Sequence, residues 1–389
     1  MTGFTLGLTA TRIFTSPDPR HTGMTPNDLR ADIPVCDEGV YLNTGASGPA
    51  PRSVVDATTG FVEYHETDAP TGEGAYPAAF GTFEETRAVV ADFLGAAESE
   101  VALTASTADG IATVASALDW EAGDVVVRTD LEHPAGVLPW WNLRRQGVET
   151  RVLECPDGRM DGDELKDAVA DAKLLCLNSI TWNYGTRLPI PEIVDVAHDA
   201  GTMVLVDAVQ TFGQRDVTVD DWGADFVAGA GHKWLLGPWG AGFLWVSEER
   251  IDDVRPARVG YRSVTDPNAA DPELKPGAAR VEVGTTNPAP YVGLQQAMEN
   301  AHAVGLDTIE SRIAELTGRL KDGLGDRLLS PREYESGLVT FTADDPEATV
   351  ERLADAGVYV RDLPHPAAVR ASVHVFNTAG DVDALLDAL

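Results

Sequence analysis

Short apolar runs separated by amphipathic stretches fill the middle of this chain, and they restrict its fold more than any other feature. Six such runs lie at residues 101–106, 125–129, 174–180, 203–209, 225–231 and 242–247. Continuous apolar runs are typical of strands buried on both faces of a sheet. Helical patterns lie between them, for example at 107–118 and 191–200. The alternation predicts an α/β fold with a mostly parallel sheet.

The length of 389 residues predicts two domains, because a single core stops growing near ~250–300 residues. From about residue 290 the pattern changes to long helices, followed by two strands. We therefore expect an N-terminal arm at 1–25, a large domain at 26–265, and a small α+β C-terminal domain at 266–389 that takes in part of the N-terminal segment. The loop at 264–279 is either a hinge or lid, or a plain surface connection.

The charge balance is strongly acidic, with 62 acidic and 29 basic residues and a net charge of -33. Nucleic-acid binding is disfavoured, because phosphate attraction needs a basic surface. Dispersed acid with few lysines favours a cytoplasmic enzyme of a halophile, although a generic acidic protein has the same composition. The sequence shows neither an apolar stretch long enough for a membrane span nor a secretory signal.

Cysteine and histidine spacing argues against a metal or disulfide framework. Cys36, Cys155 and Cys176 are odd in number and form no CxxC pair. The eight histidines include no HExxH motif, which disfavours a metal hydrolase. We expect no metal site.

Polar residues that directly follow the apolar runs are the first candidates for a site, because ligands bind at the carboxyl ends of parallel strands. They are Asp207, the pair His232 and Lys233, and His133. Lys233 stands in the uncharged segment G-A-G-H-K-W-L-L-G-P-W-G, which is atypical of a surface lysine. A buried amine with a nearby anion and a flat group is what a pyridoxal cofactor requires. Asp207 alone would more simply be a helix cap or an ion-pair partner. Lys233 follows it by 26 residues, a spacing that puts both on neighbouring strand ends and favours a joint role.

The segment V-D-A-V-Q-T-F-G, followed by D-F-V-A-G-A-G-H-K-W-L-L-G-P-W-G-A-G, resembles the signature of the class V aminotransferase family. This family of fold type I pyridoxal enzymes includes cysteine desulfurases, selenocysteine lyases, isopenicillin N epimerase-like proteins, kynureninases and transaminases. Further matches follow in family order: Y-L-N-T-G-A-S-G-P-A-P, T-A-S-T-A-D-G-I, L-E-H-P-A-G, I-T-W-N-Y-G-T-R-L-P, V-E-V-G-T-T-N and V-R-A-S-V-H-V-F-N-T. The resemblance implies fold type I with a mostly parallel seven-stranded sheet, pyridoxal 5'-phosphate as the cofactor, and a homodimer.

The resemblance also implies roles for residues around the cofactor. Lys233 would hold it as a Schiff base, Asp207 would bind the pyridinium nitrogen, and His133 would stack on the ring; these three are the catalytic candidates. The remaining cofactor candidates are Gln210 near the phenolic oxygen, Thr107 with Ala108 and His232 at the phosphate, and Thr285 at the phosphate of the other subunit. Thr107 also fits an ordinary helix cap.

The same resemblance implies a pocket for an amino-acid substrate. Arg370 would bind the substrate carboxylate through two parallel hydrogen bonds, although a surface ion pair would also explain an arginine there. Arg361 is a second candidate for this pocket, and Trp182 with Asn183 would line the substrate side of the ring. Four other tryptophans, Trp140, Trp141, Trp234 and Trp239, are expected in the core.

Two departures from the family pattern bear on a phosphate contact and on the function, respectively. Ala230 replaces a serine or threonine that many relatives carry two residues before the histidine of H-K. The stretch R-D-L-P-H-P-A-A-V-R lacks the cysteine that desulfurases use to take up sulfur. This absence disfavours a cysteine desulfurase or selenocysteine lyase proper.

We therefore expect a pyridoxal-phosphate-dependent enzyme acting on an amino acid, with transamination, C–S cleavage and epimerisation all open. A nicotinamide dehydrogenase is a weaker alternative: Gly229 and Gly231 begin a G-x-G pattern, but Trp234 stands in place of its third glycine. A non-catalytic pyridoxal-binding protein is a third.

Overall fold

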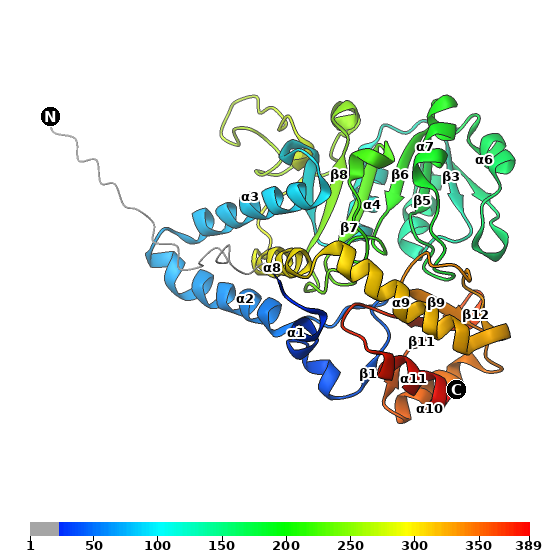
Figure 1. Ribbon diagram of the computed structural model, residues 1–389. Coiled ribbons are helices and arrows are strands. Elements are labelled where there is room, and N and C mark those ends of the chain that lie inside the picture. The colour runs from blue at the N-terminus through cyan, green and yellow to red at the C-terminus, as the bar shows by residue number, and fades with distance from the viewer. Residues whose placement is uncertain (1–22) are drawn as a thin grey trace.

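The computed structural model describes residues 23–389, whose strands form one large sheet and two small ones. Residues 1–22, which make up most of the predicted N-terminal arm, lie outside the described residues. Figure 1 shows the large sheet on one side of the molecule and the small sheets near the C-terminus.

The large sheet has seven strands in the order β2-β8-β7-β6-β5-β3-β4. Their bounds are β2 Val101–Thr104, β3 Val125–Thr129, β4 Glu149–Leu153, β5 Leu174–Asn178, β6 Met203–Asp207, β7 Phe226–Ala230 and β8 Gly242–Val246. Five strands, from β7 to β4, pair in parallel, while β8 runs antiparallel to both β7 and β2. The predicted mostly parallel, seven-stranded sheet is confirmed.

Helices cover both faces of this sheet, as the alternating sequence pattern predicts (Figure 1). One face packs against α3, α6, α7 and α8, and the other against α4 and α5. The bounds are α1 Pro26–Ala31, α2 Arg52–Glu63, α3 Ala75–Leu94, α4 Thr107–Ala117, α5 Leu138–Leu143, α6 Gly162–Val169, α7 Ile190–Asp199, α8 Ala289–Val304, α9 Leu306–Leu324, α10 Pro346–Asp355 and α11 Ala379–Ala388.

Local sequence explains where these helices begin and end. Ser106 caps α4 by accepting a hydrogen bond from the backbone N–H of Asp109 at 3.1 Å. Gly95 ends α3 in the left-handed conformation, with φ at 67°. The cap marks where α4 begins, and this N-terminus lies just after the carboxyl end of β2.

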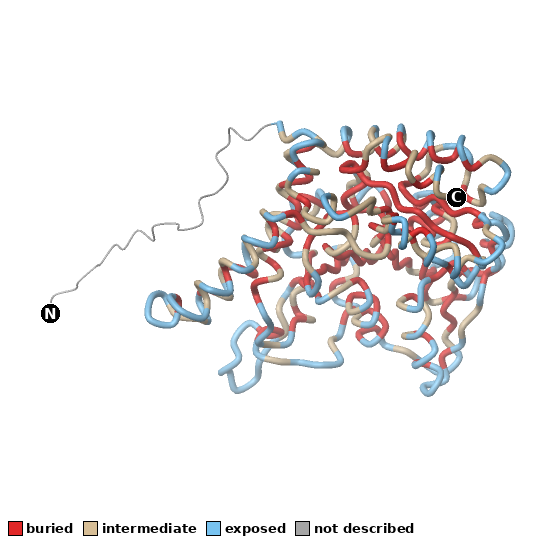
Figure 2. Tube along the Cα trace, turned by 90° about the horizontal axis from the view of Figure 1, so that it is seen from below, coloured by how far each residue is buried: buried red, intermediate tan, exposed pale blue. Residues whose placement is uncertain are grey.

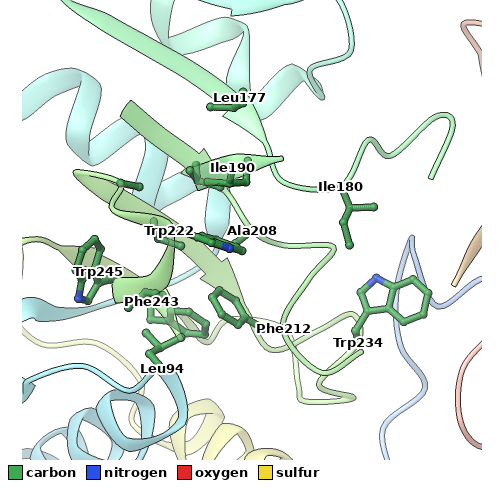
Figure 3. Close-up of a cluster of buried hydrophobic side chains, with 14 of the residues drawn as sticks. Leu94, Leu177, Ile180, Ile190, Ala208, Phe212, Trp222, Trp234, Phe243 and Trp245 are labelled. Carbon is green, nitrogen blue, oxygen red and sulfur yellow. The ribbon is translucent and has the colours of Figure 1, made fainter. Parts of the chain in front are cut away.

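Aromatic side chains form part of the core, and Figure 3 shows one region of it, where Trp222, Phe243 and Trp245 pack near β6 to β8. Trp140 and Trp234 are buried, as expected. The expectation was wrong for Trp141 and Trp239, which are 61% and 70% exposed. Both belong to apolar sequence stretches, but tertiary placement leaves them at the surface.

The C-terminal part contains an antiparallel sheet in the order β11-β12-β9, with β9 Leu338–Phe341, β11 Arg361–Pro364 and β12 Ala367–Ser372. A second, two-stranded sheet pairs β1 Val40–Tyr41 with β10 Val358–Tyr359 in parallel. These strands share a separate apolar core with α9, α10 and α11. The domain boundary near residue 265 stays a prediction.

Exposed residues lie mainly on the outer sides of the helices and in the loops (Figure 2). The loop at 264–279 is largely exposed, and its role as hinge or plain connection stays open. Among the helices of residues 23–389, none is both long and apolar enough to span a membrane.

Candidate active site

A cavity of about 310 Å³ lies at the carboxyl ends of β6 and β7, beside the N-terminus of α4. It brings together nine of the eleven predicted site residues from distant parts of the chain. These nine are Thr107, Ala108, His133, Asp207, Gln210, His232, Lys233, Arg361 and Arg370. The predicted Trp182 also lines it. The arrangement follows from the rule that strand ends meet at one edge of a parallel sheet.

Lys233 follows β7 and extends into this cavity. Burial lowers the pKa of its amine to about 8, and the positive charges of Arg370 and Arg361 act in the same direction, while Asp207 opposes them. A lysine with this pKa carries a substantial neutral fraction near physiological pH. The neutral amine is the form that reacts with an aldehyde.

Asp207 is the last residue of β6 and is only 4% exposed. Its Oδ1 accepts a hydrogen bond from the backbone N–H of Val209 at 3.0 Å. Burial raises the pKa of the carboxyl, whereas this hydrogen bond and Lys233 lower it. Asp207 therefore places a buried acid against the cavity without an arginine or lysine ion pair among the described residues.

His133 and His232 present neutral imidazoles to the cavity. Desolvation and then the charge of Lys233 lower the pKa of each to about 4. His133 Nδ1 accepts from the N–H of Ala135 at 3.3 Å, and its ring stands edge-on to Trp182 with centroids 5.6 Å apart. His232 lies 4.7 Å from the ring of Trp239. Both histidines are uncharged at neutral pH and present flat surfaces.

The N-terminus of α4 forms another wall of the cavity. Thr107 is its first residue, and the hydroxyl oxygen of Thr107 is buried without a hydrogen-bond partner. Free N–H groups and the helix dipole favour an anion at such a terminus. A buried unpartnered hydroxyl there is a second feature suited to a phosphate.

Two arginines enter from the β11–β12 hairpin, where Arg361 and Arg370 are paired across the strands. Arg370 is fully buried; its Nη1 donates to the carbonyl of Trp182 at 2.7 Å, while Nε and Nη2 have no partner. Burial lowers the pKa of Arg370 to about 9, which leaves it charged at neutral pH. The guanidinium of Arg361 lies 6.0 Å from the ring centroid of Trp182. Unused donors of a buried guanidinium fit a carboxylate.

Gln210 lines the cavity, but its side-chain amide already makes two hydrogen bonds. Nε2 donates to the carbonyl of Gly45 at 3.0 Å, and Oε1 accepts from Trp234 Nε1 at 2.7 Å. Through these two bonds, Gln210 connects the segment around Gly45 to Trp234, the residue that follows Lys233.

Two predicted site residues do not line the cavity. Asn183 is 5% exposed, and its Nδ2 donates to the carbonyl of His365 at the tip of the hairpin, at 3.3 Å. Thr285 is exposed, with its hydroxyl 2.6 Å from the Tyr261 hydroxyl. In this single chain, the structure therefore brings neither side chain into the site.

Sequence reasoning missed Trp239, Gly45 and Ala46, which line the cavity, and Glu132, which lies buried behind it. Glu132 directly precedes His133, so its position beside a candidate was the only available signal. A second cavity, of about 370 Å³, lies beside Thr211, Arg215 and Trp222. None of the predicted site residues lines that second cavity, and we assign no chemistry to it.

The comparisons with known proteins agree with this geometry. The family model described as aminotransferase class-V matches residues 40–385. A probable cysteine desulfurase of Methanothermobacter thermautotrophicus is 33% identical, over 94% of this chain and 98% of its own length.

Two solved structures resemble more than nine-tenths of the chain. The apo structure of a cysteine desulfurase from Thermococcus onnurineus NA1 has a TM-score of 0.86 and 29% identity, covering 94% of this chain and 97% of its own. The cystine C–S lyase C-DES, in complex with its reaction product cysteine persulfide, has a TM-score of 0.86 and 26% identity, covering 91% and 98%.

Proposed function

Because the chain belongs to the aminotransferase class-V family, we propose that it is a carbon–sulfur lyase that acts on cysteine or cystine. Family membership confirms three predictions from the sequence, namely fold type I, an enzyme, and pyridoxal 5'-phosphate as the cofactor. It also decides against a nicotinamide dehydrogenase. The reaction and the role of each residue remain proposals.

The residues of the cavity fit pyridoxal phosphate. The buried, unpartnered hydroxyl of Thr107 at the α4 N-terminus suits the phosphate. Asp207 offers an acid for the pyridinium nitrogen, Lys233 offers the amine, and His133 offers a flat neutral ring. Bound there, the cofactor would withdraw electrons from the α-carbon of an amino acid.

The chain's own residues supply binding and proton transfer. The free Nε and Nη2 donors of Arg370 would bind the substrate carboxylate and orient its α-carbon. Lys233, with its pKa near 8, would then take the α-proton as a general base. Its position on a loop held by the Gln210 and Trp234 hydrogen bond keeps the amine in place.

The observation that carries the proposal is the lack of a thiol at the cavity. None of the chain's three cysteines lines it, and the hairpin that carries both arginines has none. Cys155 and Cys176 are buried, and burial raises the pKa of Cys155 to about 12 and of Cys36 to about 11. Such thiols stay protonated and are poor nucleophiles. Sulfur would therefore leave the substrate without first binding to the protein.

An elimination reaction would release sulfur from the substrate without a protein thiol. The α-proton leaves, the Cβ–S bond breaks, and the electron pair departs on sulfur; the remaining three-carbon unit takes up water and gives pyruvate and ammonia. Cysteine would yield hydrogen sulfide, and cystine would yield cysteine persulfide. The similarity to C-DES, a cystine C–S lyase solved with cysteine persulfide, supports this reaction.

Product analysis tests the proposal. The purified, cofactor-loaded protein is incubated with L-cysteine or L-cystine without a keto acid. We expect pyruvate and ammonia in equal amounts, and the same turnover from a variant in which Cys36, Cys155 and Cys176 are all alanine. Alanine as the main product would overturn the elimination.

Cysteine desulfuration is the second candidate, because relatives that match most of the chain are named cysteine desulfurases. It would need a thiol from another molecule to accept the sulfur. Alanine formed only when an external thiol is present would identify this reaction. If neither alanine nor pyruvate forms, transamination or epimerisation of another amino acid becomes the leading account.

The predicted homodimer belongs to this proposal. Thr285 is exposed and lies outside the cavity of its own chain, as a residue that completes a neighbouring site would. The cytoplasmic and halophilic assignments also stay predictions.

A further inference from the structure

Glu132 is a buried acid that the proposed reaction does not use. It lies between β3 and the turn Pro134–Gly136, directly before His133, and is 7% exposed. Its Oε1 accepts from Thr129 Oγ1 at 2.6 Å and from the backbone N–H of Asn178 at 3.2 Å. Glu132 thus joins the carboxyl ends of β3 and β5.

The second oxygen of this carboxyl, Oε2, is buried and has no hydrogen-bond partner. It points toward the turn that follows His133, since a Cβ added to Gly136 would lie 3.1 Å from it. A charged carboxylate with one bare oxygen in an apolar interior is costly, whereas a protonated carboxyl is much less so. The geometry therefore favours the neutral acid.

The surroundings of Glu132 add no positive charge. Asn178, which donates to Glu132, is the register partner of Asp207 on the adjacent strand. The titratable groups that face Glu132 are Asp207 and the thiols of Cys155 and Cys176. Among the described residues, no arginine or lysine forms an ion pair with it. Two buried acids near each other cannot both ionise cheaply.

We infer that Glu132 is a positioning residue that stays protonated in the folded enzyme, joining the carboxyl ends of β3 and β5 beside His133 and leaving Asp207 as the single carboxylate behind the cofactor. Burial raises the pKa of Glu132 to about 8, and the charge of Asp207 acts in the same direction, while the hydrogen bonds from Thr129 and Asn178 oppose the rise. The inference rests on the cofactor site of the proposed function, but not on which substrate bond breaks.

Infrared difference spectra of the holoenzyme test the proton directly. The spectrum of wild type minus Glu132→Gln should contain the carbonyl stretch of a protonated carboxyl at pH 6, which disappears as the pH rises through about 8. Glu351→Gln, an exposed site on α10, gives the baseline for loss of one carboxyl. Absence of the band at pH 6 would overturn the inference, whatever the products of the reaction.

Stability gives a second readout. The pKa of Glu132 rises from 4.5 in the unfolded chain to about 8 in the fold, so the folded state binds the extra proton between these values. Relative to Glu132→Gln, wild type should lose stability as the pH rises through this window and then level off. A difference between the two proteins that does not change with pH would contradict a retained proton.

Comparing glutamine with alanine at position 132 distinguishes a positioning role of Glu132 from a general role in packing. Glutamine can accept the same two hydrogen bonds as the neutral acid, whereas alanine cannot. Glu132→Gln should bind pyridoxal phosphate within about twofold of wild type, and Glu132→Ala roughly tenfold more weakly, a loss typical of one or two hydrogen bonds. Equal weakening in both variants would overturn the positioning role.

Discussion

Lys233 owes its reactivity to its neighbours. Burial lowers its pKa to about 8, and the opposing charge of Asp207 keeps the pKa from falling further. Below this value the amine is protonated and unreactive, and above it the amine is neutral. The two histidines in the cavity have pKa values of about 4, so they stay neutral at every pH at which the Lys233 amine titrates.

Cofactor capture should therefore depend on pH with a midpoint near 8. When the cofactor-free protein is mixed with pyridoxal phosphate from pH 6 to 10, the rate of the absorbance change should rise through that midpoint. In Asp207→Asn the midpoint should move to lower pH, because the attraction that favours the charged amine is lost. A shift of the midpoint to higher pH would contradict this electrostatic account.

Arg370 is the other residue whose chemistry depends on burial. Arg370→Lys keeps the charge but loses the two-pronged donor that fits a carboxylate. We expect KM for the amino acid to rise roughly 10- to 100-fold, the value of one or two hydrogen bonds to a charged group, with a smaller change in kcat. Steady-state kinetics check this, and a change confined to kcat would assign Arg370 a different role.

At the residue scale, the sequence predicted which side chains line the cavity better than it predicted their contacts. Lys233 and Asp207 were found because each lies at the end of an apolar run, whereas the role of His133 came from the resemblance to the family. Glu132 was missed, since nothing in a single sequence shows that a glutamate beside a histidine will be buried. Asn183 was expected at the substrate, but its amide is bonded to the hairpin carbonyl of His365.

Elements were predictable where their pattern was strong. The apolar runs located six strands of the large sheet, but β4 was not among them, because Glu149–Leu153 at the sheet edge begins with three polar residues and buries only Leu153. Trp239 shows the opposite error: it belongs to an apolar stretch and was expected in the core, but it is exposed beside the cavity. Residues of edge strands and of cavity entrances are only partly buried, so their hydrophobic pattern predicts structure less well than that of a central strand.

His374 makes one of the contacts between the C-terminal part and the segment around Lys233. Its Nδ1 accepts from the N–H of Val375, so Nε2 carries the proton and donates to the carbonyl of Trp234 at 2.8 Å. The ring also stacks on Trp234, with centroids 5.6 Å apart. This buried bond joins the segment after β12 to the residue next to Lys233.

His374→Phe should keep the stacking but leave the Trp234 carbonyl without its donor. We expect a loss of about 1–3 kcal/mol in the free energy of unfolding, the cost of an unsatisfied buried polar group. Denaturation at pH 7 measures the loss, and His365→Phe at the exposed hairpin tip is the control. Equal stability of His374→Phe and wild type would show that the bond contributes nothing.

For the whole molecule, the main open prediction is a dimer in which Thr285 completes the neighbouring site. Coexpression of Lys233→Ala and Thr285→Ala chains distinguishes the arrangements. In a mixed dimer, one site would have both intact residues, so activity should exceed that of either variant alone. If Thr285 acts within its own chain, no site is intact and mixing restores nothing.

The sequence predicted the fold of the single chain more reliably than it predicted how chains assemble into a dimer. The order of strands and helices along the chain predicted the α/β sheet, since each local pattern agrees with the fold. Assembly depends on surfaces such as that around the exposed Thr285, whose partner no single chain displays. The net charge of -33 likewise predicts self-repulsion that salt would screen, without identifying the environment.

The central claim is that Lys233 anchors the cofactor, and covalent trapping tests it most directly. The holoenzyme is reduced with borohydride, digested, and examined by mass spectrometry. The account predicts a pyridoxyl group on the peptide that contains Lys233, and none after the same treatment of Lys233→Ala. A pyridoxyl group on any of the other four lysines, or an unlabelled wild-type protein, would contradict it.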